Sequence, residues 1–181
     1  MTFRILLVAL ATPVLAAASV ISSGTATIPG TWSFDFDAGV LDNFALNPAA
    51  DVFWEQFTST TRALEPENGA TIVNLGVVSF ASVTLSELEG LSYGTSGLSG
   101  SDVGGVLVSG DVFAIHTNDG NFAKVLVTGS LVPDSDNGLP IQWETDSPSV
   151  VPEPSYSLLV LVGTLCAFLY RRIARWRSLR T

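Results

Sequence analysis

Apolar residues follow two different patterns along the chain. Two continuous apolar blocks lie near the ends, at residues 5–15 and 156–170, whereas the region between them has short runs rich in Val, Ile, Phe, Thr and Trp. Gly, Asn, Asp, Ser and Pro separate these runs, which is typical of strands and turns, and helical periodicity is scarce. The central region is therefore predicted to be mainly β. The expected strands are residues 31–37, 52–58, 71–73, 83–85, 107–108, 112–117, 122–128 and 141–144.

The clearest local unit is a β-hairpin over residues 111–128. Its centre, Asn-Asp-Gly at residues 118–120, tolerates positive φ and lies between two runs of β-branched and aromatic residues. Alternation along a strand sends successive side chains to opposite faces. The two faces of the first strand are then Val112, Ala114 and His116 on one side and Phe113, Ile115 and Thr117 on the other.

Several such hairpins favour a two-sheet β-sandwich or jelly roll, and a closed barrel is the alternative architecture. One helical turn is expected at residues 86–90, ended by Gly90 and capped by Thr84 or Ser86. Residues 92–110 contain six glycines and are expected to form a flexible loop or a glycine-rich strand edge. This segment lacks the Gly-Lys-Ser/Thr sequence of a phosphate-binding loop.

The first 18 residues have the pattern of a secretory signal peptide. Arg4 precedes the apolar run at residues 5–15, and three alanines with small side chains follow at residues 16–18. We expect cleavage after Ala18, which would export the remainder of the chain. The run is too short to span a bilayer, which agrees with a signal peptide. A buried N-terminal helix or strand is the alternative.

The other end of the chain consists of three successive segments. Residues 147–155 form a Pro/Ser-rich linker, in which Pro152 and Pro154 lack backbone donors and keep the chain extended. Residues 156–170 are predicted to be a transmembrane helix of about 22 Å, short of the roughly 30 Å hydrocarbon core unless flanking side chains snorkel. The Arg-rich tail, residues 171–181, is expected to stay cytoplasmic, leaving the ectodomain of residues 19–146 on the far side. The arginines that set this topology are Arg171, Arg172, Arg175 and Arg177.

The tail carries Val151, Pro152, Glu153 and Pro154, then the apolar stretch, then the arginines. In this order it resembles the tails of the PEP-CTERM family of exported bacterial proteins, which carry a Pro-Glu-Pro motif, a transmembrane helix and an Arg-rich end. The resemblance implies that an exosortase, a membrane-embedded, cysteine-dependent transpeptidase-like enzyme, processes the chain near this motif. It also implies an association with extracellular polysaccharide or biofilm. A C-terminal anchor that is never processed is the alternative, and both interpretations place the protein at the cell envelope with membrane lipid as a partner.

Charge is distributed unevenly along the chain. Six of the eight basic residues lie near the ends, and sixteen of the seventeen acidic residues lie within residues 35–146. With only Arg62 and Lys124 to balance them, the central region has a formal charge of −14. Nucleic acid is therefore a poor partner, because binding it depends on neutralising phosphates with Lys and Arg. The single cysteine, Cys166, lies in the C-terminal apolar block, so the central domain must be stabilised by packing.

The sequence indicates no cofactor other than a possible Ca²⁺. Asp134, Asp136 and Asn137 before Gly138 match the first part of a calcium loop, although the distal glutamate of an EF-hand is missing. An acidic hairpin turn is the alternative, because turns favour the same residues. A divalent ion would relieve the repulsion in so acidic a domain.

Three tryptophans are candidates for carbohydrate binding. Exposed aromatic rings can stack on sugar rings, whereas buried ones contribute a large packed area to the core. The two roles are alternatives for Trp32, Trp54 and Trp143.

Evidence for catalysis in the sequence is weak. His116 is the only imidazole, and the Gly-x-Ser-x-Gly motif of a nucleophile elbow is missing. Asp35 with Asp37, or Glu87 with Glu89, offer the paired carboxylates of a glycosidase, but such pairs are also common on solvated strands and turns. We therefore expect a non-enzymatic surface or extracellular-matrix protein, with a carbohydrate- or calcium-binding module as the alternative and a surface glycosidase after that.

Overall fold

The computed structural model describes residues 19–43, 47–129, 138–148 and 164–165. One compact unit spans Ala18–Ser149. Its described residues form ten strands in two five-stranded sheets, together with one 3₁₀ helix and one short α-helix. The prediction of a mainly β fold is therefore confirmed.

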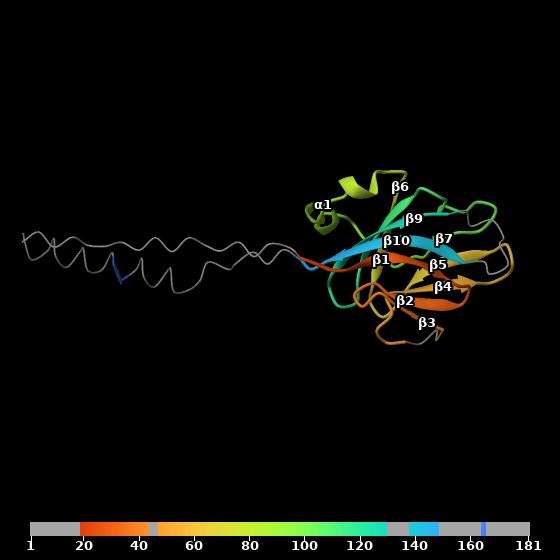
Figure 1. The fold of residues 1–181 in the computed structure, drawn as a ribbon, viewed down its shortest axis with the longest axis horizontal. Coiled ribbons are helices and arrows are strands. Elements are labelled where there is room, and N and C mark those ends of the chain that lie inside the picture. Colours follow the sequence, from red (N-terminus) through yellow and green to blue (C-terminus); the bar gives the residue numbers. More distant parts are fainter. Residues whose placement is uncertain (1–18, 44–46, 130–137, 149–163, 166–181) are drawn as a thin grey trace, which may run out of the picture. The chain divides into compact units, whose positions relative to one another are not determined.

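Sheet A is built from the first strand of the unit and four later ones. All neighbouring strands in it are antiparallel. In spatial order they are β1 (Val20–Ile28), β10 (Leu139–Asp146), β9 (Phe122–Val127), β8 (Val112–His116) and β6 (Thr71–Gly76). The first and last strands of the unit thus lie side by side (Figure 1), and the Ser147 N–H donates to the Ser19 carbonyl at 3.0 Å.

Sheet B is antiparallel as well and comes mostly from the first half of the unit. Its spatial order is β3 (Val40–Asp42), β2 (Trp32–Asp35), β4 (Val52–Gln56), β5 (Arg62–Pro66) and β7 (Leu98–Ser99). The two sheets form separate layers (Figure 1), so the described strands make a sandwich and not the closed barrel that was the alternative.

Large apolar side chains from both sheets fill the space between the layers. Phe34 and Trp54 of sheet B pack in one buried cluster with Phe113, Ile115 and Trp143 of sheet A. The Phe34 ring meets the Trp143 ring edge-on, with centroids 4.9 Å apart. Burial of this cluster is the main stabilising contribution in a domain without a disulfide.

A second, smaller cluster covers the outer face of sheet A. Val112 and Ala114 pack there against Leu88 of α1 (Leu85–Glu89), beside the 3₁₀ helix η1 (Phe80–Ser82). The opposite faces predicted for the strand at 112–117 are therefore confirmed, since Phe113 and Ile115 point into the main core.

The predicted helical turn is present, and Thr84 caps it. The Thr84 hydroxyl accepts from the Glu87 N–H, while the Glu87 carboxylate accepts from the Thr84 N–H at 2.7 Å. This capping box starts a helix at Leu85, so the prediction of a strand at residues 83–85 is wrong.

Other differences from the predicted strands have local causes. Residues 107–108 form no strand, because the Val108 N–H donates to the Asp111 carboxylate at 3.0 Å and the Leu107 N–H reaches the Ser99 carbonyl. Strands β1, β3, β5 and β7 were not predicted. They are short or rich in Ser, Thr, Gly and charged residues, and in β1 only Ile28 is fully buried.

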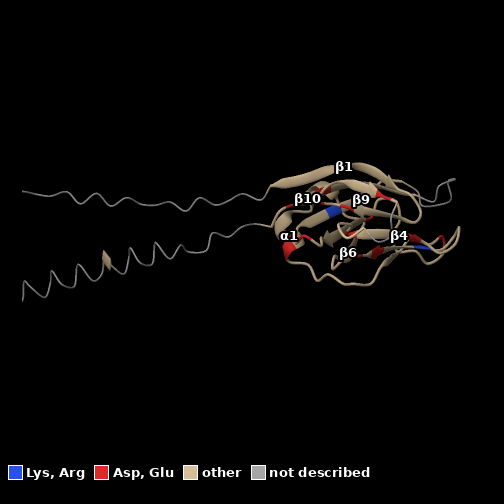
Figure 2. Ribbon diagram, turned by 90° about the horizontal axis from the view of Figure 1, so that it is seen from below, with Lys and Arg blue, Asp and Glu red and all other residues tan. Residues whose placement is uncertain are grey.

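The two basic residues of the central region are already engaged. Arg62 is buried in an ion pair with Asp102. The Lys124 ammonium lies 2.8 Å from the Glu144 carboxylate, donates to the Val83 carbonyl and sits over the Phe80 ring. Figure 2 shows how few basic positions the domain has among its acidic ones.

Among the described residues, none of the helices has the length and hydropathy that a membrane span requires. Of the predicted span at residues 156–170, only Thr164 and Leu165 are described, and both are helical. The predicted signal peptide, residues 1–18, and the tail, residues 171–181, lie outside the described residues.

Candidate functional site

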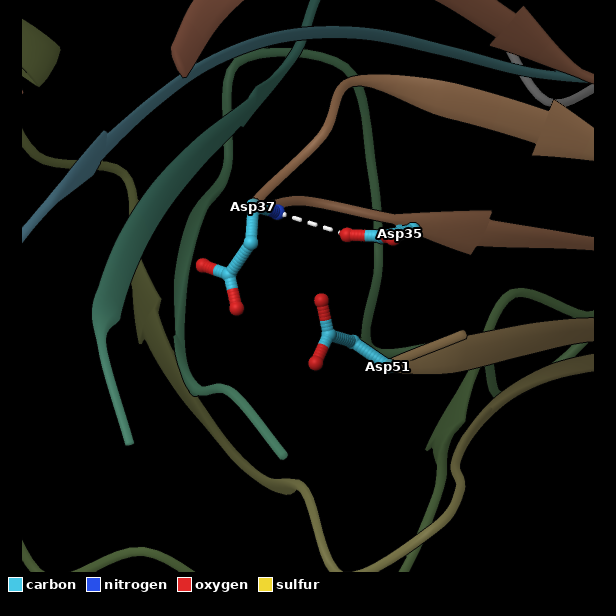
Figure 3. A group of neighbouring side chains, drawn as sticks. All are labelled: Asp35, Asp37 and Asp51. Atoms are coloured by element: carbon cyan, nitrogen blue, oxygen red, sulfur yellow. Dashed lines mark hydrogen bonds between the residues drawn. The ribbon is translucent and has the colours of Figure 1, made fainter. Parts of the chain in front are cut away.

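Three aspartates meet where sheet B ends beside the hairpin of sheet A. Asp35 is the last residue of β2, Asp37 lies in the turn to β3, and Asp51 directly precedes β4. One carboxylate oxygen from each lies within 4.8 Å of the other two (Figure 3). The pairing of Phe34 with Val52 between β2 and β4 brings Asp35 opposite Asp51.

Asp35 shapes the turn that carries Asp37. Its Oδ1 accepts from the N–H groups of Asp37 and Ala38, both at 2.9 Å. The turn closes at Gly39, whose φ of +66° disfavours other residues, and a Cβ there would lie 3.0 Å from the Trp143 indole. The carboxylate at the end of the strand therefore fixes the backbone around the cluster.

Asp51 is buried and bonds to both sheets. Its Oδ2 accepts from the Phe36 N–H at 2.8 Å, and its Oδ1 accepts from the Asn118 N–H at 2.8 Å. Asn118 belongs to the turn between β8 and β9. The Phe36 carbonyl in turn accepts from the hydroxyls of Ser22 and Thr145 on β1 and β10. Asp51 is thus held rigidly by groups from both layers.

Asp37 differs from its neighbours because its carboxylate has no hydrogen-bond partner in the described part of the chain. Each of its oxygens exposes less than 1 Å². The side chains of Thr117 and Asn121 lie close enough to lower its pKa, but neither reaches it in hydrogen-bond geometry. Figure 3 shows the Asp37 and Asp51 carboxylates extending toward the same space.

Burial dominates the electrostatics of the cluster. Burial raises the pKa of Asp51 to about 7, although the hydrogen bonds from the Asn118 and Phe36 N–H groups lower it. The charges of Asp37 and Asp35 raise this pKa further. Burial also raises the pKa of Asp37, with a further contribution from the charges of Asp35 and Asp119. The ionised cluster is therefore costly unless a proton or a cation compensates it.

Carboxylate oxygens at this spacing suit a hard cation. The cluster contains neither His nor Cys, so its chemistry is that of oxygen ligands. Asp35 and Asp37, one of the two candidate carboxylate pairs for glycoside hydrolysis, belong to this cluster. Their third partner, Asp51, is fully buried and already holds two backbone donors, which is a poor arrangement for attack on a polysaccharide.

Comparisons with known proteins supply no relative for this chain: no family model, curated protein or solved structure matches it.

The three tryptophans lie in or against the main core. Trp54 is fully buried, and Trp143 is 7% exposed and donates its indole N–H to the Ser22 hydroxyl at 2.8 Å. Trp32 is partly buried and packs against the same cluster. Neither Trp54 nor Trp143 presents a ring face to a sugar, so the structure favours the packing role for them.

The other candidate catalytic residues take part in packing or in helix capping. His116 is half-buried on β8 and stacks on Phe122, with ring centroids 4.8 Å apart. Glu87 is occupied by the capping box of α1, and Glu89 lies at the end of the same helix.

An open apolar pocket of about 330 Å³ lies beside this helix, lined by Leu75, Val78, Ser82, Val83, Glu87 and Leu91.

Several predicted site residues lie outside the described residues. They are the sorting motif Val151, Pro152, Glu153 and Pro154, the arginines Arg171, Arg172, Arg175 and Arg177, and the calcium-loop candidates Asp134, Asp136 and Asn137.

Sequence reasoning did not identify Asp51 as a site residue. The sequence does carry a signal for it: Asp51 immediately precedes the apolar run at 52–54, and Asp35 immediately follows the aromatic segment at 32–34. Using it required knowing that these two runs pair antiparallel.

Proposed function

We propose that this chain is an exported, membrane-anchored, non-enzymatic protein of the cell surface or extracellular matrix, sorted by an exosortase through its C-terminal tail. The observation that carries the proposal is the order of the tail: Val151-Pro152-Glu153-Pro154, an apolar stretch, and an arginine cluster. The arginines favour a cytoplasmic end, and the N-terminal signal pattern favours export of everything before the tail.

The limits of the compact unit support this proposal. The unit spans Ala18–Ser149, its first strand begins at Val20 and its last strand ends at Asp146. Cleavage after Ala18 and processing near Pro152 would therefore leave all ten described strands and the main core intact. The acidic surface of the domain also suits an exported protein that must stay soluble outside the membrane.

Deletion of residues 151–181 tests the anchor. The tail-less chain should leave the membrane fraction and collect in the periplasm or medium, whereas the full chain should sediment with membranes. A tail-less chain that remained in the membrane fraction would contradict the proposal.

A second variant separates processing from simple anchoring. Replacing Pro152, Glu153 and Pro154 together with Ala keeps the apolar stretch and the arginines. In a host with an exosortase, this variant should accumulate as the uncut membrane form while the natural chain is shortened. If neither chain is shortened, the unprocessed anchor is the correct interpretation.

A further inference from the structure

We propose that Asp35, Asp37 and Asp51 bind one Ca²⁺ ion, which ties the end of sheet B to the β8–β9 hairpin of sheet A. The proposal is independent of sorting, because a tail that is never processed would leave these three residues unchanged.

The first support is the unpartnered carboxylate of Asp37. Both of its oxygens are shielded from solvent, exposing less than 1 Å² each, and neither has a hydrogen-bond partner among the described residues. A buried carboxylate without partners is strongly unfavourable. One of its oxygens points into the space shared with Asp51 (Figure 3), where a cation would give it a partner.

The second support is the lack of any protein counter-charge for the cluster. Arg62 and Lys124 are the only Lys or Arg residues in the range 19–148. Both form ion pairs with acids outside the cluster, Asp102 and Glu144. Three carboxylates with ligand atoms within 4.8 Å of one another therefore need compensation from outside the domain.

The third support is that the donors are already positioned. Asp35 Oδ1 is held by two N–H groups, which leaves its Oδ2 outside these two bonds. Each Asp51 oxygen accepts one N–H and keeps a second lone pair. The backbone donors orient the carboxylates from behind, as second-layer partners do in metal sites.

The surroundings favour Ca²⁺ over other ions. Only oxygen ligands are offered, which disfavours Zn²⁺ and similar ions that prefer His and Cys. Mg²⁺ holds its water shell tightly, and the solvent-shielded oxygens of Asp37 leave little room for water on that side. Ca²⁺ accepts irregular sets of six to eight oxygens, including bidentate carboxylates.

The competing explanation is a proton shared between Asp37 and Asp51. It would neutralise one charge without any metal. The two explanations differ in their response to added Ca²⁺, so a titration separates them.

The test uses the purified full chain in detergent micelles after treatment with EDTA. Calcium chloride is titrated by isothermal calorimetry, with magnesium chloride in parallel. We expect one Ca²⁺ per chain, with a Kd on the order of 10⁻⁴–10⁻³ M, and weaker binding of Mg²⁺. At 10 mM Ca²⁺ the midpoint of thermal unfolding should rise by about 5 °C or more.

Asp37→Asn is the matching variant, because the Asp37 carboxylate has no hydrogen-bond partner among the described residues that the amide would lose. Its Ca²⁺ affinity should fall at least about tenfold. Asp119→Asn is the control, because it removes an exposed charge that acts on Asp37 but does not belong to the cluster. The Ca²⁺ affinity of this variant should stay within about threefold of that of the natural chain.

A wild-type measurement locates the site if Asp37→Asn does not fold. Ca²⁺ should slow hydrogen exchange at the Phe36 and Asn118 amides, which donate to Asp51. Three results would overturn the proposal: no Ca²⁺ heat and no thermal shift, tighter binding of Mg²⁺ than of Ca²⁺, or undiminished binding in a folded Asp37→Asn variant.

Discussion

The Asp51 carboxylate accepts a 2.8 Å hydrogen bond from the backbone N–H of Asn118, 67 residues further along the chain. Asp51 directly precedes β4 of sheet B, and Asn118 lies in the β8–β9 turn of sheet A. This bond connects the two layers, and the Phe36 N–H donates to the other oxygen of the same carboxylate at 2.8 Å. Removing its acceptor should therefore weaken the whole sandwich.

Asp51→Ala should lower the free energy of unfolding by about 2–3 kcal/mol in EDTA, because the buried N–H of Phe36 and the partly buried N–H of Asn118 lose their acceptor. Asp51→Asn keeps a carbonyl oxygen and relieves repulsion with Asp35 and Asp37, so its loss should be smaller. Urea unfolding followed by tryptophan fluorescence measures both. Asp119→Ala, an exposed acid, should change stability by less than about 0.5 kcal/mol. Equal losses of unfolding free energy for Asp51→Ala and Asp119→Ala would show that the hydrogen bonds of Asp51 do not hold the two sheets together.

Gly24 faces Trp143 across the β1–β10 pair, and a Cβ at this position would lie 2.8 Å from the indole ring. Gly24→Ala should therefore cost about 1–3 kcal/mol through overpacking. Gly90→Ala is the control, because its nearest contact would be 3.5 Å and its φ is −89°. The same urea measurement should show a change within about 0.5 kcal/mol for the control. A Gly24→Ala variant as stable as the natural chain would mean that Trp143 packs elsewhere.

Strand β1 contains a buried and an exposed isoleucine that make a matched pair. Ile28 is fully buried and Ile21 is 44% exposed. Ile28→Ala should destabilise the domain by about 2–4 kcal/mol, whereas Ile21→Ala should cost less than about 0.5 kcal/mol. Thermal unfolding of the two variants compares them directly. Similar losses would show that β1 does not enter the core through Ile28.

The capping box predicts an acid response of α1. Bonds from the Thr84 N–H and hydroxyl lower the pKa of Glu87 below the ordinary value of 4.5. A lowered folded-state pKa means that the contribution to stability is complete above about pH 4.5 and is lost as the pH falls through the folded-state value. At pH 7 the Glu87→Gln variant should therefore be less stable than the natural chain. The difference in stability between the two should become smaller in acid, where Glu87 of the natural chain is protonated.

Hydrogen exchange at the Leu88 amide, followed from pH 7 to 3 and corrected for intrinsic rates, measures this response. Asp119→Asn, at an exposed acid in the β8–β9 turn and outside α1, should leave the pH profile of the natural chain unchanged. A Glu87→Gln profile parallel to that of the natural chain would contradict the prediction.

Local signals in the sequence predicted local structure well. The β8–β9 hairpin followed from Asn-Asp-Gly between two β-branched runs, and the helical turn followed from Thr84 and Gly90 as caps. Both depend on residues a few positions apart, so tertiary contacts had little to add. The prediction at residues 83–85 failed because the cap begins a helix there.

Long-range features were harder to predict. Strand β1 has mainly Ser, Thr, Gly and Ala after Ile21, and it is a strand because β10 provides a partner along its whole length. The acidic cluster depends on pairing between β2 and β4, which are separated in the chain by β3, a strand that was not predicted. Composition alone therefore identified an acidic β domain without locating its acidic centre.

Tracking both sides of the Pro-Glu-Pro motif in a bacterium tests the central claim most directly. One epitope tag is placed between Ser147 and Val151 and a second after Thr181, and both are followed by pulse-chase and fractionation with and without an exosortase. The account predicts that only the exosortase strain separates the tags, with the domain-side tag outside the inner membrane. Both tags on one uncut chain in the cytoplasm would contradict it.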